Sequence, residues 1–394
     1  GPGSLYPSMM TARSNNSESV WAALRRSRGG VAGALVLGAM MLACLGSLPY
    51  TLGTTRADPV AGTSASVRYD DQNRYARNLP PTLGLREVRP DTEGRDTPEQ
   101  RLYDAAVRSA YVAEARWHNS LSKHPLTTAD QLQERGSPLS FERPENNRVV
   151  YLLGTDLLGR SLLIRSLAGG GISLVIGLCA ATLSVLLGTL YGSIAGYVGG
   201  RTDALMMRIV DILYGLPSIL LVVLLSVAVN SVLDRVQARG GISPQWVQTV
   251  RLITLLVAIG GVSWLTMARV IRGQVMSLKN QLFVEAARAM GVSTRGIFLR
   301  HLLPNLVGPI VVYATLTVPQ AILQESFLSF LGIGVAPPMP SWGNLAAEGL
   351  SELNAYRSHW WLILFPCAFL GVTLLALNFM GEGLREALDP KRAK

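Results

Sequence analysis

The amino-acid sequence predicts an all-α membrane protein with six transmembrane helices and a long outer insertion of helical and irregular structure. Charged residues make up only 16% of the 394 residues, whereas soluble domains carry about 25%. The apolar residues gather in six runs, each almost free of charge, and a helix of ~20 such residues crosses a bilayer. Basic residues are concentrated in alternate short connections between these runs, which is typical of a multi-pass membrane protein.

The six runs are separated by charged segments. They cover the interval between Arg28 and Arg56, then Ser166 to Gly200, Ile212 to Leu233, Leu252 to Ala268, Leu302 to Gln324 and Trp360 to Gly381. The first run follows several arginines, as the core of a secretory signal does. It is longer than an ordinary signal core and no clear cleavage site follows, so an uncleaved anchor is predicted. Gly188, Gly192 and Gly196, spaced four residues apart in the second run, predict close packing of that helix against another.

The distribution of lysine and arginine predicts the orientation. Four basic residues precede the first run, two lie in the second-to-third link, six in the fourth-to-fifth link and four in the tail. The opposite short loops hold only Arg235, Arg239, Arg251 and Arg357. Because short cytoplasmic loops are enriched in basic residues, we expect both termini to be cytoplasmic. The net charge of +10 follows this topology and does not indicate a nucleic-acid surface.

These runs divide the chain into six segments. We expect a cloning remnant and leader at 1–8, a cytoplasmic amphipathic segment at 9–29, the first transmembrane helix at 30–55, an extracytoplasmic insertion at 56–165, a core of five transmembrane helices with a long loop at 279–304 in residues 166–384, and a cytoplasmic tail at 385–394. Within the insertion, capping patterns at Thr97 and Thr128 predict two helices, and several prolines predict irregular chain.

Residues that carry common enzyme chemistry are scarce. Of the four histidines, His118 and His124 lie near Glu114, and a solvated helix face is a better interpretation of them than a metal site. No Gly-x-Ser-x-Gly elbow, HExxH pair or Walker A loop occurs. We therefore expect no catalytic residue, no metal site and no ATP hydrolysis by this chain. The three cysteines lie in apolar runs and are expected to be small buried hydrophobes: Cys44, Cys179 and Cys367.

The most informative stretch is the link between the fourth and fifth runs, FVEAARAMGVSTRGIFLRHLLPN (residues 283–305). Strong helix formers precede Gly291, which fits a left-handed helix end. Ser293 or Thr294 can cap a second short helix, and Pro304 suits the first turn of the next span. The sequence therefore predicts a helix-turn-helix at the membrane surface.

The spacing of Glu285-Ala286-Ala287, Gly291 and Leu303-Pro304 resembles the EAA motif of binding-protein-dependent ABC importer permeases. His301 stands where the general motif has isoleucine, as is common in the peptide subfamily. Six patterns in the family's order resemble the dipeptide, oligopeptide and nickel subfamily: LGTDLLGR (153–160), GxxAGYxGGxxD (192–203), RHLLPN (300–305), LSFLGIG (328–334), PSWGN (340–344) and GLREALDP (383–390).

This resemblance implies a type I ABC importer permease, a non-catalytic pore subunit of the bacterial cytoplasmic (inner) membrane. The implied partners are a second, different permease subunit, two cytoplasmic ABC ATPase subunits that bind ATP and Mg, an extracytoplasmic solute-binding protein and membrane lipids, with no nucleic acid. Peptides are the implied solute. Nickel complexes, peptide antibiotics and glycosides are the alternatives.

Three groups of residues are candidates for function. The resemblance implies ATPase coupling by Glu285, Ala286, Ala287, Arg288, Gly291, Arg295, His301 and Pro304. The candidate pore or gate residues, which are polar or helix-breaking groups in the apolar runs, are Asp211, Pro217, Asn230, Gln320, Gln324, Glu325 and Asn378. The candidate binding-protein contacts, in a proline-rich outer loop, are Pro340, Trp342 and Asn344. For Asp211 the alternative is pairing with Arg208 on the same helix face, and Pro217 is expected to bend the third span.

Two other classes of function fit less well. An ion-coupled secondary transporter would place ionisable residues near the middle of broken helices, and the mid-span regions are almost free of charge. A membrane-anchored structural protein would account for the long insertion but not for the EAA pattern. Copurification of an ATPase distinguishes the importer from both.

Overall fold

The computed structural model describes residues 27–54, 67–72, 78–81, 86–87, 148–149, 151–239, 243–353 and 358–388. These residues fall into two compact units, which are described separately below. The first unit contains the described parts of residues 1–53, 67–70 and 164–394, and the second those of 54–66 and 71–163.

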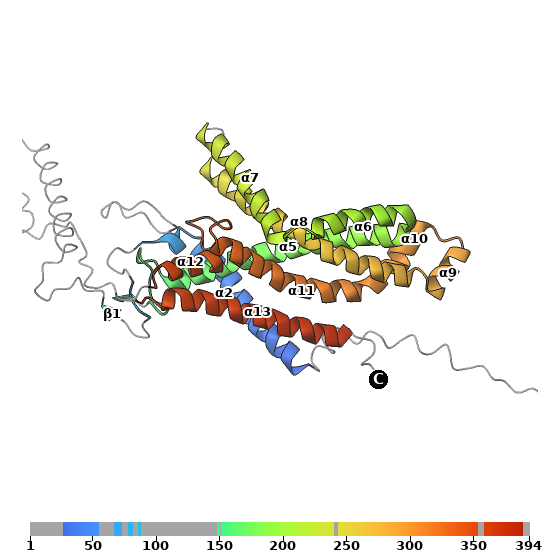
Figure 1. The fold of residues 1–394 in the computed structure, drawn as a ribbon. Helices are drawn as coiled ribbons and strands as arrows, with labels where there is room; N and C mark the ends of the chain where they lie inside the picture. Colours follow the sequence, from blue (N-terminus) through green and yellow to red (C-terminus); the bar gives the residue numbers. More distant parts are fainter. Residues whose placement is uncertain are drawn as a thin grey trace, which may run out of the picture. The chain divides into compact units, whose positions relative to one another are not determined.

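Helices build the first unit (Figure 1). They are α2 (Arg28–Thr51), α5 (Leu162–Val198), α6 (Gly200–Tyr214), α7 (Ser218–Ala238), α8 (Pro244–Leu278), α9 (Leu282–Ala289), α10 (Thr294–Ile297), α11 (Leu303–Phe330), α12 (Trp342–Ser351) and α13 (Trp361–Leu388), with a 3-10 turn at Arg68–Asp70 and a π-helical turn at Phe298–Leu302. Six stretches of the described residues are long and apolar enough to cross a membrane: Arg28–Thr51, Leu162–Val198, Ser218–Ala238, Trp246–Leu278, Thr294–Phe330 and Trp361–Ala387. The prediction of an all-α fold with six transmembrane helices is confirmed.

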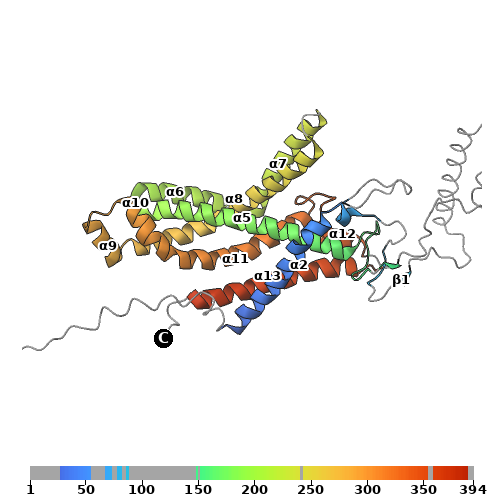
Figure 2. The ribbon, with the colours of Figure 1, turned by 180° about the vertical axis from the view of Figure 1, so that it is seen from behind.

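These helices pack along one another around three apolar clusters. Helix α2 lies beside α13, and α11 contacts α8, α12 and α13 (Figures 1 and 2). One cluster joins α5, α8 and α11 through residues such as Ile176, Ile259 and Leu328. A second joins α8 to α9, α10 and the start of α11. The third joins α2, α5, α12 and α13, with Cys44 and Trp342 fully buried in it.

A seam of glycines brings α5 and α8 into backbone contact. A Cβ atom added at Gly188, Gly192 or Gly196 would lie 2.3 to 2.7 Å from an atom of residues 267–272 on α8. No real Cβ fits at such distances, so the two helices approach as closely as their backbones allow. The predicted close packing at these three positions is confirmed.

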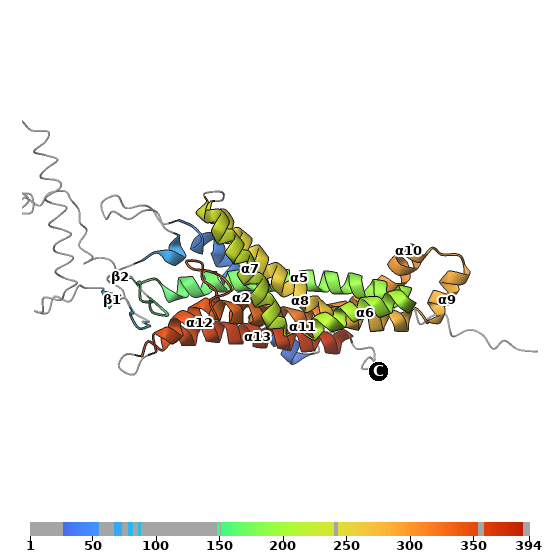
Figure 3. The ribbon, with the colours of Figure 1, turned by 45° about the horizontal axis from the view of Figure 1, so that its top comes forward.

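The third predicted span, Ile212 to Leu233, is wrong as a single helix. Helix α6 ends at Tyr214 and α7 begins at Ser218, with Pro217 immediately before the first turn of α7. Proline has no N–H and a fixed φ, so it begins a new helix here instead of bending a continuous one. Figure 3 shows α7 diverging from α6 beyond this break.

The fourth span is much longer than the predicted interval Leu252 to Ala268, because α8 has 35 residues. The predicted limits were set by Arg251 and Arg269, and Arg272 follows one turn later. Each of these arginines forms an ion pair with an aspartate of α6 or α7. A paired arginine is tolerated within a long helix, whereas the sequence pattern treats every arginine as an end.

Of the three cysteines, only Cys44 is buried as predicted. Cys179 and Cys367 are exposed on the surface of this chain. Both lie on predicted membrane helices, where an apolar run does not require that a particular side chain face the interior of its own chain.

The second unit contains one short antiparallel pair of strands within the described residues. Strand β1 (Arg86–Glu87) pairs with β2 (Arg148–Val149), and Glu87 lies opposite Arg148. The two helices predicted from Thr97 and Thr128 lie outside the described residues.

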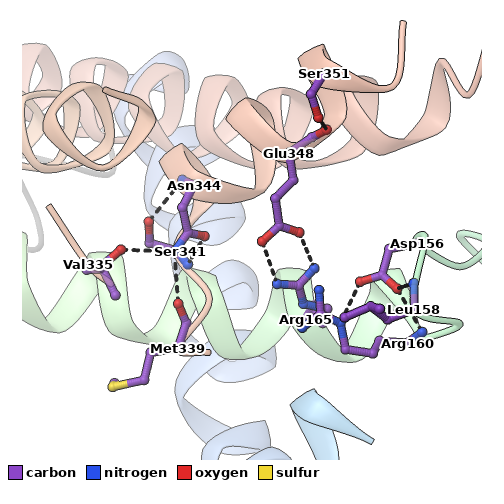
Figure 4. A network of polar contacts seen from close by, with 10 residues as sticks. All are labelled: Asp156, Leu158, Arg160, Arg165, Val335, Met339, Ser341, Asn344, Glu348 and Ser351. Carbon is purple, nitrogen blue, oxygen red and sulfur yellow. Dashed lines mark hydrogen bonds and ion pairs between the residues drawn. The ribbon is translucent and has the colours of Figure 1, made fainter. Parts of the chain in front are cut away.

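The LGTDLLGR pattern forms a tight turn in this second unit. The Asp156 carboxylate accepts hydrogen bonds from the N–H groups of Leu158 and Arg160, and it binds the Arg160 guanidinium at 2.7 Å (Figure 4). Gly159 has a φ of 74°, a value that favours glycine. Aspartate, glycine and arginine of the LGTDLLGR pattern thus each have a structural role in this turn.

Candidate functional site

The loop at 279–304 forms the predicted helix-turn-helix. Helix α9 ends in a left-handed turn at Gly291, which has a φ of 78°, and the N–H of Val292 returns to the carbonyl of Ala287 at 3.1 Å. Ser293 then caps α10, because its hydroxyl accepts a hydrogen bond from the N–H of Gly296 at 3.3 Å. The predicted left-handed turn and the predicted serine cap are both confirmed.

The inner face of α9 is anchored to two membrane helices. Val284 and Ala287 are buried, and they belong to one apolar cluster with Ile271 of α8, Ile297 of α10 and Leu302 beside α11. Because protein interiors are close-packed and transmit displacement, a force on α9 is carried directly into α8 and α11.

The outer face of α9 is open. Glu285, Ala286 and Arg288 are exposed, and so are two large apolar side chains at its ends, Leu282 at 82% and Met290 at 75%. Sequence reasoning singled out the small and charged positions and missed these apolar ones. No sequence signal marked them, because single exposed apolar residues are common on protein surfaces.

A pocket of about 500 Å³ lies beside this open face. It is lined by Met290, Gly291, Val292, Ser293, Arg295, Gly296, Leu299 and Arg300. A Cβ added at Gly291 would meet nothing within 4 Å, so the space in front of this turn is free for a partner.

Two coupling candidates lie further along the chain. His301 is half-buried, and its carbonyl accepts a hydrogen bond from the amide of Asn305 at 2.6 Å. Pro304 is exposed in the first turn of α11. Neither lines the pocket beside α9.

Of the pore candidates, Gln320 and Gln324 come together in a second, larger pocket. This pocket of about 670 Å³ lies between the α6–α7 break, α8 and α11 and is lined by Leu213, Tyr214, Leu216, Ser218, Ile219, Val262, Ser263, Leu265, Thr266, Gln320, Leu323, Gln324 and Phe327. Pro217 adjoins the lining. Asn230, half-buried on α7, and Asn378, exposed on α13, lie elsewhere.

Asp211 pairs with a residue that the sequence did not suggest. Its carboxylate binds the Arg269 guanidinium of α8 at 2.8 Å, and the alternative partner Arg208 is not used. The same guanidinium lies 4.1 Å from the centre of the Tyr214 ring. Asp211 therefore helps to hold the end of α6 against α8.

Glu325 is placed differently from the other pore candidates. It is fully buried on α11 and lies outside the lining of the large pocket. Its carboxylate accepts hydrogen bonds from Ser329 at 2.7 Å and from Ser326 at 3.3 Å. Ser329 also accepts from the N–H of Val335 at 2.9 Å, so Glu325 fastens the loop after α11 from inside this chain.

The three predicted binding-protein contacts are buried, which corrects that prediction. Asn344 and Ser341 form a reciprocal capping box, and the Asn344 amide donates to the carbonyls of Val335 and Met339 (Figure 4). The Trp342 indole N–H donates to the carbonyl of Ser166 at 3.1 Å. Pro340 is buried as well. These residues fold the outer loop and are not available on its surface.

An ion pair holds α12 against α5. The guanidinium of Arg165, only 1% exposed, binds both carboxylate oxygens of Glu348, at 2.5 and 3.0 Å (Figure 4). A bidentate arginine–carboxylate pair fixes the relative orientation of the two side chains as well as their distance. It therefore fixes the outer loop relative to α5.

A second bidentate ion pair joins α6 to the C-terminal part of α8. Arg272 donates to both oxygens of Asp203 at 2.5 and 2.6 Å. These hydrogen bonds hold the pKa of the Asp203 carboxyl below its ordinary value, against the opposing effect of burial. Asp203 is the last residue of the GxxAGYxGGxxD pattern. The arginines near the C-terminal end of α8 were the sequence signal for its ion-pair partner.

The chain matches, over residues 188–394, the family described as binding-protein-dependent transport system inner membrane component. It is 46% identical over 241 residues to the oligopeptide transport system permease protein of Haemophilus influenzae, covering 61% of this chain and 70% of that protein. It is 44% identical to the dipeptide transport system permease protein of Bacillus subtilis, covering 61% and 69%, and 37% identical to the oligopeptide permease of Mycobacterium tuberculosis, covering 61% and 76%. The six membrane helices and the loop around Gly291 agree with this match, and the chain belongs to the family of binding-protein-dependent transport system inner membrane components, as a permease subunit.

Proposed function

We propose that this chain forms one half of the pore of an ATP-driven ABC importer that moves peptides inward from an extracytoplasmic binding protein. The relatives named for oligopeptide and dipeptide transport support peptides as the solute. The coupling role is supported by the two faces of α9. Its inner face packs against the membrane helices, and its outer face is exposed.

The outer face of α9 has the chemistry of a docking surface for a partner. Small residues at Ala286 and Gly291 allow close backbone approach, exposed Leu282 and Met290 offer apolar contact, and the charges of Glu285 and Arg288 set orientation. A partner that contacts α9 differently in its open and closed states biases the permease between outward-facing and inward-facing conformations.

In this proposal the partners are two cytoplasmic ATPases, a second, different permease and an extracytoplasmic binding protein. ATP and Mg are held by the ATPases, and this chain contributes no catalytic group. The chain spans the bacterial inner membrane with both termini in the cytoplasm, which places α9 on the ATPase side.

Replacement of Gly291 tests the coupling role. Gly291→Val strains the left-handed turn and fills the space in front of it, so we expect the ATPase to be lost on purification of the complex and peptide uptake to fail. Gly291→Asn tolerates the left-handed conformation and should keep part of both. Gly273→Val on α8, where an added Cβ also meets nothing within 4 Å, is the matched control. Normal ATPase copurification and uptake in Gly291→Val would overturn the assignment.

The orientation can be tested separately by labelling introduced cysteines in a background that lacks the three native ones. We expect Thr202→Cys and Ser293→Cys to be protected from a membrane-impermeant thiol reagent on intact cells, and Gln237→Cys and Ser351→Cys to react. Reaction of Ser293→Cys from outside would place α9 beyond any cytoplasmic ATPase and end the importer proposal.

The insertion is proposed to act outside, at the pore mouth or on the binding protein, and to be dispensable for membrane assembly. Because Glu87 lies directly opposite Arg148, an Asn-Gly pair can join them as a two-residue hairpin in place of residues 88–147. We expect the shortened chain to assemble with its partners while uptake falls. Full uptake would show that the insertion is incidental to transport.

A further inference from the structure

The large pocket between α6, α7, α8 and α11 combines an apolar wall with uncharged polar groups. Eight of its thirteen lining residues are leucine, isoleucine, valine, tyrosine or phenylalanine, and the other five are two serines, a threonine and two glutamines. None of the lining residues is charged. Tyr214 of the lining contacts the guanidinium of Arg269, whose charge is paired with Asp211.

From this lining we propose that the pocket binds an uncharged part of the transported peptide, namely one apolar side chain together with the backbone amides on either side of it. This inference rests on the proposed importer function and specifies which part of the peptide the permease itself contacts. The apolar wall takes the side chain, and the polar groups take the amides.

The two glutamines suit a peptide backbone. Gln320 and Gln324 lie one turn apart on the same face of α11, about 6 Å along the helix, close to the ~6.6 Å repeat of two extended residues. Neither side-chain amide hydrogen-bonds to another described residue of the chain. A primary amide both donates and accepts hydrogen bonds, as a peptide group does. The two glutamines can therefore hydrogen-bond to two peptide groups on the same side of an extended chain, whatever the side chains of that peptide are.

A lipid tail matches this lining less well. Polar side chains within membrane helices face cavities or partners because burial in hydrocarbon without a hydrogen bond is costly. The pocket also borders the non-helical break before α7, whose first turn has no side-chain cap. Irregular backbone at membrane depth is tolerated only beside protein or a water-filled cavity. Both features favour an aqueous path over a lipid-filled groove.

The test is uptake by the assembled transporter, with its binding protein, in ATP-loaded proteoliposomes. The probes are peptides of one length with leucine, aspartate or lysine at a single position. In Gln320→Glu and Gln324→Glu, we expect uptake of the aspartate peptide to fall at least tenfold relative to the lysine peptide, with unchanged affinity of each peptide for the binding protein. Gln274→Glu, the same exchange on an exposed part of α8 outside the pocket, should leave the ratio unchanged.

The outcomes separate this inference from the importer proposal. If the wild-type complex takes up no peptide, the proposed function fails. If it does, but the pocket variants keep the wild-type preference or lose all peptides equally, the pocket inference is wrong. A photoreactive phenylalanine analogue at Phe327 gives a second measurement, which does not depend on the glutamine variants. Crosslinking to a radiolabelled leucine peptide is the expected result, and crosslinking only to lipid or to the second permease overturns the inference.

Discussion

The ion pair between Asp203 and Arg272 should hold α6 in place, and its removal should release this helix locally. The informative change is Asp203→Asn, which keeps the size of the side chain and removes its charge. The guanidinium of Arg272 then loses its ionic partner while its surroundings stay the same.

The expected cost lies between those of exposed and buried ion pairs. The side chains of Asp203 and Arg272 are 10% and 31% exposed. Exposed pairs contribute at most ~1 kcal/mol, and breaking fully buried pairs costs ~3 to 5 kcal/mol. We therefore expect a loss of about 2 kcal/mol, which corresponds to a change of roughly thirtyfold in the equilibrium between docked and released α6.

Hydrogen exchange of the α6 backbone amides measures this equilibrium directly. In the purified complex, Asp203→Asn should raise their exchange rates about thirtyfold, and Arg272→Gln should do nearly the same. The double variant should exchange little faster than either single variant, because both remove one interaction. The control is Asp211→Asn, whose exposed pair with Arg269 should change the exchange rates about fivefold or less. Exchange within threefold of wild type in Asp203→Asn, or an equal effect in Asp211→Asn, would refute this reasoning.

The remaining predictions concern pH and packing. The pKa of Asp203 is lowered in the folded chain. The contribution of its carboxylate to the stability of docked α6 is therefore complete well above the ordinary pKa of 3.8 and is lost as pH falls through the lowered pKa. The difference in exchange rate between wild type and Asp203→Asn should persist at pH 7 and shrink below about pH 4. Gly192→Ala should lower the melting temperature of the complex, because its Cβ would lie 2.3 Å from the carbonyl of Ala268 and overpacking costs ~1 to 3 kcal/mol. Gly261→Ala is the control, because its Cβ would meet nothing within 4 Å, and it should leave the melting temperature unchanged. Equal melting temperatures of the two variants would contradict the close packing of α5 against α8 at Gly192. Trp342→Phe should cost about 2 kcal/mol, with ~1 kcal/mol from the lost hydrogen bond to Ser166 and a similar amount from the cavity that the smaller ring leaves at this fully buried site. The expected result is a lower melting temperature, and weaker binding-protein affinity at unchanged melting would instead support the surface role of Trp342.

Features set by neighbours in the chain were predictable from the sequence. The turn at Gly291 and the cap at Ser293 depend on a few adjacent residues, so their spacing alone indicated the helix-turn-helix. The glycine seam was predictable for a related reason, because residues four apart share a helix face whatever the partner helix is.

Features set by distant partners were not predictable. Arg269 and Arg272 looked like the end of a span, and only the aspartates of α6 make them part of a continuous helix. Glu325 was predicted to line the pore or gate and Trp342 to contact the binding protein, and both are buried inside this chain. A polar residue in an apolar run therefore has a partner or a cavity, but the sequence does not say which.

The contact between α5 and α8 also limits how this permease can move. Two helices whose backbones touch at three successive turns cannot rotate about their own axes or slide past each other without collision. Helix α8, with 35 residues, is about 52 Å long at 1.5 Å per residue. The contact continues to the middle of α8, where a Cβ added at Gly260 would lie 2.8 Å from the carbonyl of Ala180 on α5, so the two helices move as one rigid pair. Because α9 packs on α8 through Val284 and Ala287, a displacement of α9 is passed to α5 and α8 together and not to α8 alone.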